Sequence, residues 1–188
     1  MALDINTDRS LIATGQVGLE PMIFVWDANT AERRQFMTLP KGSRSVSALS
    51  FSHDGKYLAA ADMSDDHCVH LFDLTQTDPK KNKCVHLGSA KKDRKKIFQI
   101  QWSPTQLTSF ITVGLEHIFV WQAPDLQAKR ATNMPASKPG KQIGFPSVCY
   151  SSKGIAMIAA SDGAVYTARG GAIGKAFKGT HTKMVSCI

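Results

Sequence analysis

An apolar run that ends at the same kind of position recurs four times along this chain. The four runs are Ile23–Asp27, Val69–Asp73, Ile118–Gln122 and Val165–Arg169. Their aligned positions 26, 72, 121 and 168 are separated by 46, 49 and 47 residues. A fixed period of this length indicates that the chain repeats one small structural unit, and that unit largely decides the fold.

A second mark recurs in the same register, an aromatic residue followed by serine. It stands at Phe51-Ser52, Trp102-Ser103 and Tyr150-Ser151, and each copy is followed by a turn and another apolar segment. Two marks with one spacing, together with the dipeptide Trp26-Asp27, are typical of WD-type blades. The sequence therefore predicts an all-β fold, a WD40-type β-propeller of about four four-stranded antiparallel blades in an incomplete ring.

Each predicted blade has four short strands separated by turns rich in glycine, proline and aspartate. The predicted strands lie near 2–6, 10–15, 22–26, 34–38, 45–51, 57–62, 68–73, 83–88, 96–102, 108–113, 117–122, 127–132, 145–150, 155–160, 163–168 and 173–177. The blades cover about residues 1–40, 41–90, 91–140 and 141–180, and residues 181–188 are predicted to begin a further blade. We therefore expect a piece of a longer propeller, whose open apolar faces and strand edges favour self-association.

Composition excludes several classes of function. The 188 residues are 43% hydrophobic and 20% charged, which suits one globular core, and no apolar run approaches the roughly 20 residues that span a bilayer. The four cysteines lack C-x-x-C spacing, so no metal site or disulfide is predicted, and Cys68, Cys149 and Cys187 are expected to be buried. The dispersed histidines form no catalytic constellation. We expect a cytoplasmic protein without a cofactor that is not an enzyme.

Five residues are predicted to have structural roles at equivalent positions of the repeat. Trp26, Phe72 and Trp121 lie on third strands and are expected to be buried between neighbouring blades. Asp66 and Asp162 each stand six residues before such a position, in the turn between the second and third strands. A carboxylate there can accept hydrogen bonds from turn amides and from a histidine at the start of a blade.

The segment that joins the second and third predicted blades is strongly basic. Lys91, Lys92, Arg94, Lys95 and Lys96 supply much of the formal net charge of +8. One interpretation is contact with an acidic partner surface, and the other is a solvated loop. The absence of interleaved aromatic side chains favours a protein partner over nucleic acid.

The segment Gly170–Lys175 is similar to a phosphate-binding loop in composition only. A Walker loop needs serine or threonine after its lysine and a helix after the loop. Here Ala176 follows the lysine, and a strand is predicted next. The glycines therefore predict a hairpin turn between the third and fourth strands of a blade.

Several segments resemble the echinoderm microtubule-associated-protein-like family. The run Leu11–Gly18, followed by Phe24–Ala28, is similar to the N-terminal propeller of that family, and Val46–Ser52, Asp62–His67 and Gly179–Thr182 agree with its later segments in order. The resemblance covers nearly the whole chain. It implies part of the first of two fused atypical propellers, and a non-enzymatic interaction scaffold that associates with tubulin, microtubules and the cytoskeleton. The alternative is a general WD40 scaffold in another complex, ciliary, signalling or RNA-processing.

Overall fold

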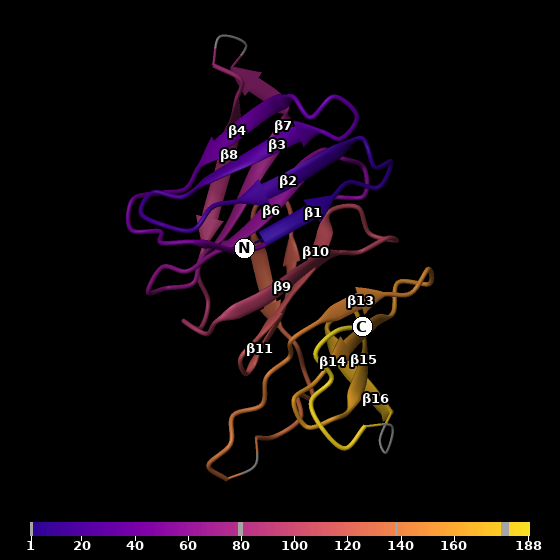
Figure 1. Cartoon of the computed structure of the whole chain (residues 1–188). Helices are drawn as coiled ribbons and strands as arrows, with labels where there is room; N and C mark the ends of the chain where they lie inside the picture. The colour runs from indigo at the N-terminus through magenta and orange to yellow at the C-terminus, as the bar shows by residue number, and fades with distance from the viewer. Residues whose placement is uncertain (1, 79–80, 138, 178–180) are drawn as a thin grey trace. The chain divides into compact units, whose positions relative to one another are not determined.

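The computed structural model describes residues 2–78, 81–137, 139–177 and 181–188, and within these ranges it consists of β-strands and turns. None of the described residues forms a helix that could cross a membrane. The strands are β1 (Ala2–Ile5), β2 (Leu11–Gly15), β3 (Met22–Asp27), β4 (Arg33–Thr38), β5 (Val46–Phe51), β6 (Tyr57–Asp62), β7 (Val69–Asp78), β8 (Lys83–Ala90), β9 (Ile97–Trp102), β10 (Ser109–Gly114), β11 (His117–Gln122), β12 (Gln127–Arg130), β13 (Val148–Tyr150), β14 (Ala156–Ala159), β15 (Val165–Arg169) and β16 (Ala172–Phe177) (Figure 1). The predicted all-β class is confirmed.

The first of two compact units contains β1–β8 together with Ala123–Leu126. Its eight strands form one sheet in the order β1-β2-β3-β4-β8-β7-β6-β5. Chain neighbours pair antiparallel within β1–β4 and within β5–β8, which gives two four-stranded blades. One parallel pair, Phe36 with Lys83, joins β4 to β8, and the Phe36 N–H donates to the Asn82 carbonyl at 2.9 Å. The two blades therefore share a hydrogen-bonded outer rim.

A second connection joins the inner parts of these two blades. The Val46 N–H donates to the Gln16 carbonyl at 3.0 Å, and the Gly18 N–H donates to the Arg44 carbonyl at 2.8 Å. Gly15 allows this close approach, because a Cβ at that position would lie 2.5 Å from the Cβ of Val46. A side chain at position 15 would therefore push β2 away from the start of β5.

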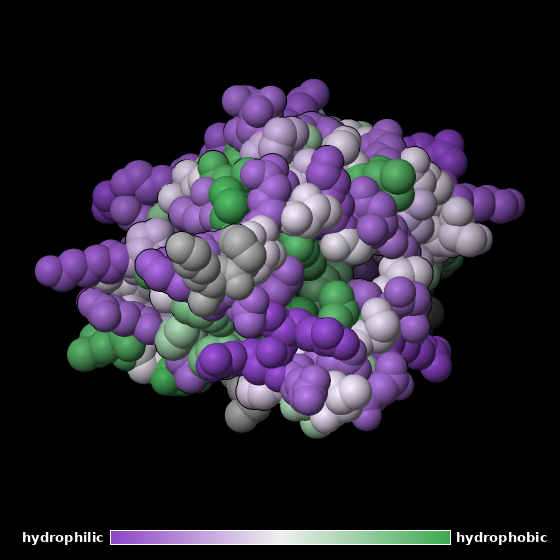
Figure 2. Space-filling model, turned by 90° about the horizontal axis from the view of Figure 1, so that it is seen from above, coloured by the Kyte–Doolittle hydropathy of each residue, from purple (hydrophilic) through white to green (hydrophobic). Residues whose placement is uncertain are grey.

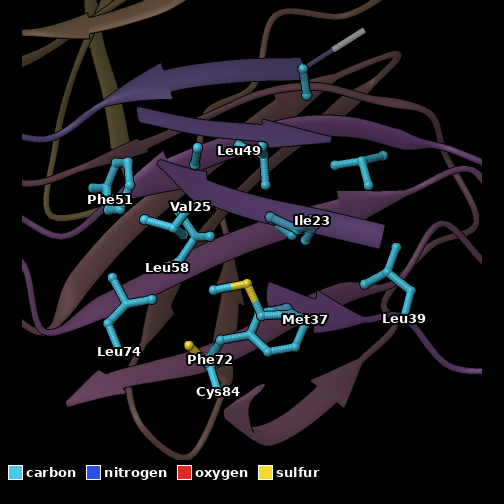
Figure 3. Packing of buried hydrophobic residues seen from close by; sticks show 14 residues of the cluster. Ile23, Val25, Met37, Leu39, Leu49, Phe51, Leu58, Phe72, Leu74 and Cys84 are labelled. Atoms are coloured by element: carbon cyan, nitrogen blue, oxygen red, sulfur yellow. The ribbon is translucent and has the colours of Figure 1, made fainter. Parts of the chain in front are cut away.

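The core of the first unit lies on one face of these strands. Ile23 and Val25 alternate with less buried residues along β3, as the period of two in a strand requires. They pack with Leu49, Leu58 and Phe72 from the other blade in one cluster of buried side chains (Figure 3). Because both blades contribute to this cluster, neither buries its apolar face alone.

Strand β7 is longer than the strand predicted at 68–73. Strand β7 continues to Asp78, with a register shift between Asp73 and Thr77. The extension is held from the neighbouring blade, because the Gln35 amide donates to the Leu74 carbonyl at 3.0 Å and to Thr77 Oγ1 at 2.7 Å. This support comes from a distant part of the chain, so local patterning could not predict it.

The second unit contains two antiparallel four-stranded sheets, in the orders β12-β11-β10-β9 and β13-β14-β15-β16. Their outer edges are bridged, because the Thr132 N–H donates to the Gly171 carbonyl at 2.9 Å and the Ile173 N–H donates to the Thr132 carbonyl at 3.0 Å. Between the sheets lies a second buried cluster that includes Ile111 and Phe145. The second unit thus repeats the connection at the outer rim.

The serine of the second repeat mark stabilises the turn between the first two strands of a sheet. Its hydroxyl accepts the backbone N–H of a residue three to five positions later, and an asparagine carbonyl does the same in the first blade. The four bonds are Tyr57 N to Ser52 Oγ, Gln106 N to Ser103 Oγ, Ile155 N to Ser151 Oγ, and Leu11 N to Asn6 Oδ1. The recurring serine is therefore explained by turn geometry.

The predictions of a further blade at residues 181–188 and of buried cysteines have different outcomes. Residues 181–188 form no strand, although the Ile188 N–H donates to Ser147 Oγ at 3.3 Å, so a further blade there stays a prediction. Residues 179 and 180 of the Gly179–Thr182 segment lie outside the described residues. The expected burial of three cysteines is wrong, because Cys68 and Cys149 are half-buried and Cys187 is exposed. Cys68 precedes β7, Cys149 lies on the edge strand β13, and Cys187 lies in a segment without a strand.

Candidate interaction surfaces

The two tryptophans of the repeat make the same hydrogen bond in different sheets. Trp26 Nε1 donates to Thr14 Oγ1, and Trp121 Nε1 donates to Thr112 Oγ1, each at 2.8 Å. In the second case His117 Nε2 also lies 2.8 Å from the threonine hydroxyl. Each bond ties the third strand of a sheet to the second, so these residues serve the framework that carries the surface.

The three aromatic residues predicted to be buried on third strands differ in their burial. Phe72 and Trp121 are each only 1% exposed. The prediction is wrong for Trp26, which is half-buried. Trp26 lies on the face of its sheet that also carries Leu3 and Ile5, and these are 61% and 47% exposed, whereas the opposite face fills the core.

A buried carboxylate that the sequence analysis did not single out holds the turn after β6. Asp62 Oδ1 accepts the N–H groups of Ser64 at 3.2 Å and Cys68 at 2.8 Å. Asp62 Oδ2 accepts the Ser43 hydroxyl at 2.7 Å and lies 3.1 Å from His70 Nε2. Burial raises the pKa of Asp62, but hydrogen bonds from His70, Ser43 and Ser64 outweigh it, so the pKa lies below its ordinary value.

The role predicted for Asp66 is therefore wrong. It lies in the expected turn, but the turn amides donate to Asp62, four residues earlier. Asp66 instead pairs with Lys91 Nζ at 2.8 Å and Arg94 Nε at 2.9 Å. Its side chain is 32% exposed, so cations reach it from the surface. The sequence Asp62-Met63-Ser64 could have indicated this role, since an aspartate two residues before a serine in a turn favours an Asx turn.

Asp162 lies in the turn between β14 and β15. Its Oδ1 accepts the Ala164 N–H at 2.9 Å, and its Oδ2 accepts the Tyr166 hydroxyl at 2.7 Å. Gly163 adopts φ +86°, a conformation that glycine adopts readily. Burial and the bond to Asp162 raise the pKa of Tyr166 to about 12. Tyrosine thus takes the place that the sequence analysis gave to a histidine.

The basic residues between β8 and β9 are partly paired within each unit. In the first unit Lys91 and Arg94 share Asp66, with side chains 57% and 75% exposed. In the second unit Lys95 Nζ lies 2.9 Å from Glu116 Oε2. Exposed ion pairs contribute only about 0–1 kcal/mol, so their main effect is to position the cations.

Lys92 and Lys96 complete the predicted basic set, and both side chains are exposed. The Lys96 carbonyl accepts the Leu115 N–H at 2.9 Å, which fixes its backbone at the start of β9. Both lysines add to the positive charge of this segment. The segment from Lys91 to Lys96, which runs from the first unit into the second, is here called the basic connector.

Apolar side chains provide a second kind of candidate surface. Leu3 and Ile5 on the edge strand β1 are largely exposed, and Phe24 beside them on the same face is half-buried. On the face of the molecule seen in Figure 2, apolar areas lie between predominantly hydrophilic residues. Contiguous exposed apolar area on a globular protein usually marks a contact with another protein or another part of the same one.

The cluster of Ser43, Asp62 and His70 contains the residue types of a hydrolase triad but not its geometry. Ser43 and His70 both contact the same oxygen, Asp62 Oδ2. A nucleophilic serine must instead donate to the imidazole, which is held by the carboxylate from its other side. This cluster therefore stabilises a turn. Among the described residues, no three His, Cys, Asp or Glu side chains are grouped so that they could hold a metal ion.

Gly170 and Gly171 form the turn between β15 and β16. Their φ angles are +55° and +84°, and Arg169 pairs with Ala172 across them. This is the geometry of a two-residue hairpin loop with two left-handed residues, for which a Gly-Gly pair is well suited. The predicted hairpin turn is confirmed.

The architecture is that of a WD-type β-propeller segment, and solved structures agree. The β-propeller domain of Myceliophteria_thermophila Cps50 (Swd1) superposes with a TM-score of 0.71 at 16% identity, over 98% of this chain and 58% of that one. The sequence profile described as the first beta-propeller of echinoderm microtubule-associated protein matches residues 1–188. The chain belongs to this family.

Curated relatives agree with the family assignment. The ciliary WD repeat-containing protein ctxp80 of Euplotoides octocarinatus is 31% identical over 166 residues, 88% of this chain. Echinoderm microtubule-associated protein-like 4 of Homo sapiens is 31% identical over 129 residues, 63% of this chain. The aligned regions are 22% and 12% of those proteins, so this chain corresponds to a small part of each.

Proposed function

We propose that this chain is a non-enzymatic interaction scaffold that associates with microtubules or tubulin in the cytoplasm. The observation that carries the proposal is the family match over residues 1–188, to the first propeller of a microtubule-associated protein. The fold supports a scaffold role, because paired strands and bonded turns hold surface side chains in fixed positions.

The basic connector is the contact that we propose for an acidic protein surface. Lys91, Arg94 and Lys95 are held by internal carboxylates, while their side chains remain partly exposed. Lys92 and Lys96 are exposed as well and add positive charge to the segment. Positive groups at neighbouring positions of the chain attract an acidic surface and increase the rate of encounter, and salt screens this attraction.

Co-sedimentation with polymerised microtubules tests this proposal. The chain should pellet with microtubules at low salt, and Lys92→Glu with Lys96→Glu should weaken binding and reduce its dependence on salt. The matched control is Lys141→Glu with Lys175→Glu, which changes the net charge equally at exposed positions elsewhere. Equal weakening by both pairs would contradict a role for the basic connector, and no pelleting of the unmodified chain would contradict microtubule association.

A scaffold subunit of a ciliary complex is the second candidate. The relative that favours it is the ciliary WD repeat-containing protein, which aligns with 88% of this chain. Microtubules are part of cilia, so localisation alone does not separate the two candidates. Failure to bind microtubules, combined with capture of a ciliary assembly by the tagged chain, would favour the second.

A further inference from the structure

The second unit contains a cavity that neither the repeat nor the basic connector explains. It has a volume of about 270 Å³ and lies between the sheet β9–β12 and the sheet β13–β16. Its walls come from the turns that follow β9, β13 and β15 and from the strands beside them. The lining residues that carry the argument are Thr105, Gln106, Tyr150, Lys153, Arg169 and Gly170.

The charge of this cavity is positive. Lys153 and Arg169 line it, and no aspartate or glutamate is among its lining residues. Both cationic side chains belong to exposed residues. Neither forms an ion pair or a side-chain hydrogen bond with another described residue, in contrast to the paired cations of the basic connector. A guanidinium and an ammonium that line one cavity, with no acid in its lining, favour an oxyanion there.

Uncharged hydrogen-bond donors belong to the lining residues as well. Tyr150 is half-buried, and its hydroxyl makes no hydrogen bond with any residue in the described part of the chain. Burial raises the pKa of Tyr150 to about 12, so at neutral pH the hydroxyl carries a proton that it can donate. The left-handed turn at Gly170 and Gly171 leaves two N–H groups that donate to no other described backbone group. N–H groups of a turn that have no backbone acceptor can donate to an anion that lies beside them.

The remaining wall suits the stem of a side chain. Half-buried Val120 supplies apolar surface beside the polar groups, whereas the other apolar lining residues, Ile111, Ala156 and Ala168, are almost fully buried. A free inorganic anion would leave this surface in contact with water, whereas a methylene chain that ends in an anion would cover it. We propose that this cavity is a docking site for an anionic side chain of a protein partner, a carboxylate or a phosphorylated serine or threonine. The inference deepens the interaction-scaffold function proposed above and rests on it.

Titration of the isotope-labelled 188-residue chain with short peptides tests the proposal by NMR. The peptides are Ala-Ala-X-Ala-Ala with blocked ends, where X is phosphoserine, glutamate or serine. We expect saturable shifts of the Gly170 and Gly171 amides with the anionic peptides and none with the serine peptide. Response to phosphoserine alone identifies a phosphorylated partner, and response to both identifies any acidic side chain. No response to either anionic peptide, or an equal response to the serine peptide, overturns the proposal.

Variants connect the shifts to the cavity. Arg169→Gln and, separately, Lys153→Gln should each weaken peptide binding about tenfold or more, because each removes a charge-assisted hydrogen bond. The matched control is Lys175→Gln, an exposed lysine on β16 outside the cavity, which should bind as before. Equal affinity of all three variants would overturn the proposal. The microtubule assay is separate from the peptide titration. If the unmodified chain pellets with microtubules but binds no anionic peptide, only the cavity proposal is contradicted. If it binds the peptide but does not pellet, only microtubule association is contradicted.

Discussion

Replacement of Trp121 by alanine should destabilise the chain far more than the same change at Trp26, although both occupy one position of the repeat. Trp121 is 1% exposed, stacks parallel to Phe110 with ring centroids 5.9 Å apart, and donates to Thr112 Oγ1. Truncation of so buried an aromatic side chain costs about 3–5 kcal/mol. Trp26 is half-buried and loses less apolar contact, so about 1–2 kcal/mol is expected.

Urea denaturation followed by far-ultraviolet circular dichroism measures this difference. A gap of about 2 kcal/mol should separate the two urea midpoints by roughly 1 M. Thr112→Val is a useful companion, because it removes the hydroxyl that accepts from Trp121 Nε1 and leaves a buried donor unpaired, at a cost of about 1–3 kcal/mol. If Trp121→Ala cost no more than Trp26→Ala, burial would not be what distinguishes the two tryptophans, and the assignment of the core would be refuted.

Three further outcomes are expected. The pKa of Asp62 is lower in the folded chain than its ordinary 3.8, so this carboxylate contributes stability that is present above about pH 4 and lost as the pH falls toward the folded pKa. Asp62→Asn should therefore flatten the acid side of a plot of unfolding free energy against pH, measured by denaturation. An unchanged slope would contradict this. Light scattering of the isolated chain should show self-association, and Leu3→Glu with Ile5→Glu should reduce it, whereas a stable 20.5 kDa monomer before mutation would refute the role of this face. Asp66→Ala should leave the thermal midpoint almost unchanged, because its cationic partners are exposed, and a clear drop in the midpoint would show that the turn depends on these ion pairs.

The repeat marks predicted the sheets because each mark corresponds to a local bond. The serine at positions 52 and 151 accepts an N–H four or five residues later, so its spacing from the next strand is visible in the sequence. Asp27 similarly accepts the N–H groups of Asn29 and Thr30 directly after the third strand. Features that depend on neighbours within a few residues could be predicted to within a few positions.

Features that depend on distant residues could not be predicted. Asp62 accepts bonds from its own turn, but its second oxygen also accepts the hydroxyl of Ser43, which lies 19 residues earlier in the chain. The extension of β7 depends on Gln35, about 40 residues away in sequence. The burial of a third-strand aromatic residue depends on what covers its face of the sheet, which the repeat position of Trp26 does not specify. The cavity beside Arg169 likewise needs turns from two sheets.

The parallel pair between β4 and β8 has a mechanical consequence. Pulling the first blade away from the second must stretch the bond from the Phe36 N–H to the Asn82 carbonyl at the outer rim and the bond from the Val46 N–H to the Gln16 carbonyl further in. Tension applied across β1–β8 is thus shared by two hydrogen-bonded anchor points, and both blades contribute to one apolar core. Under load the two blades should yield together in a single event, and force spectroscopy would record one step for these strands.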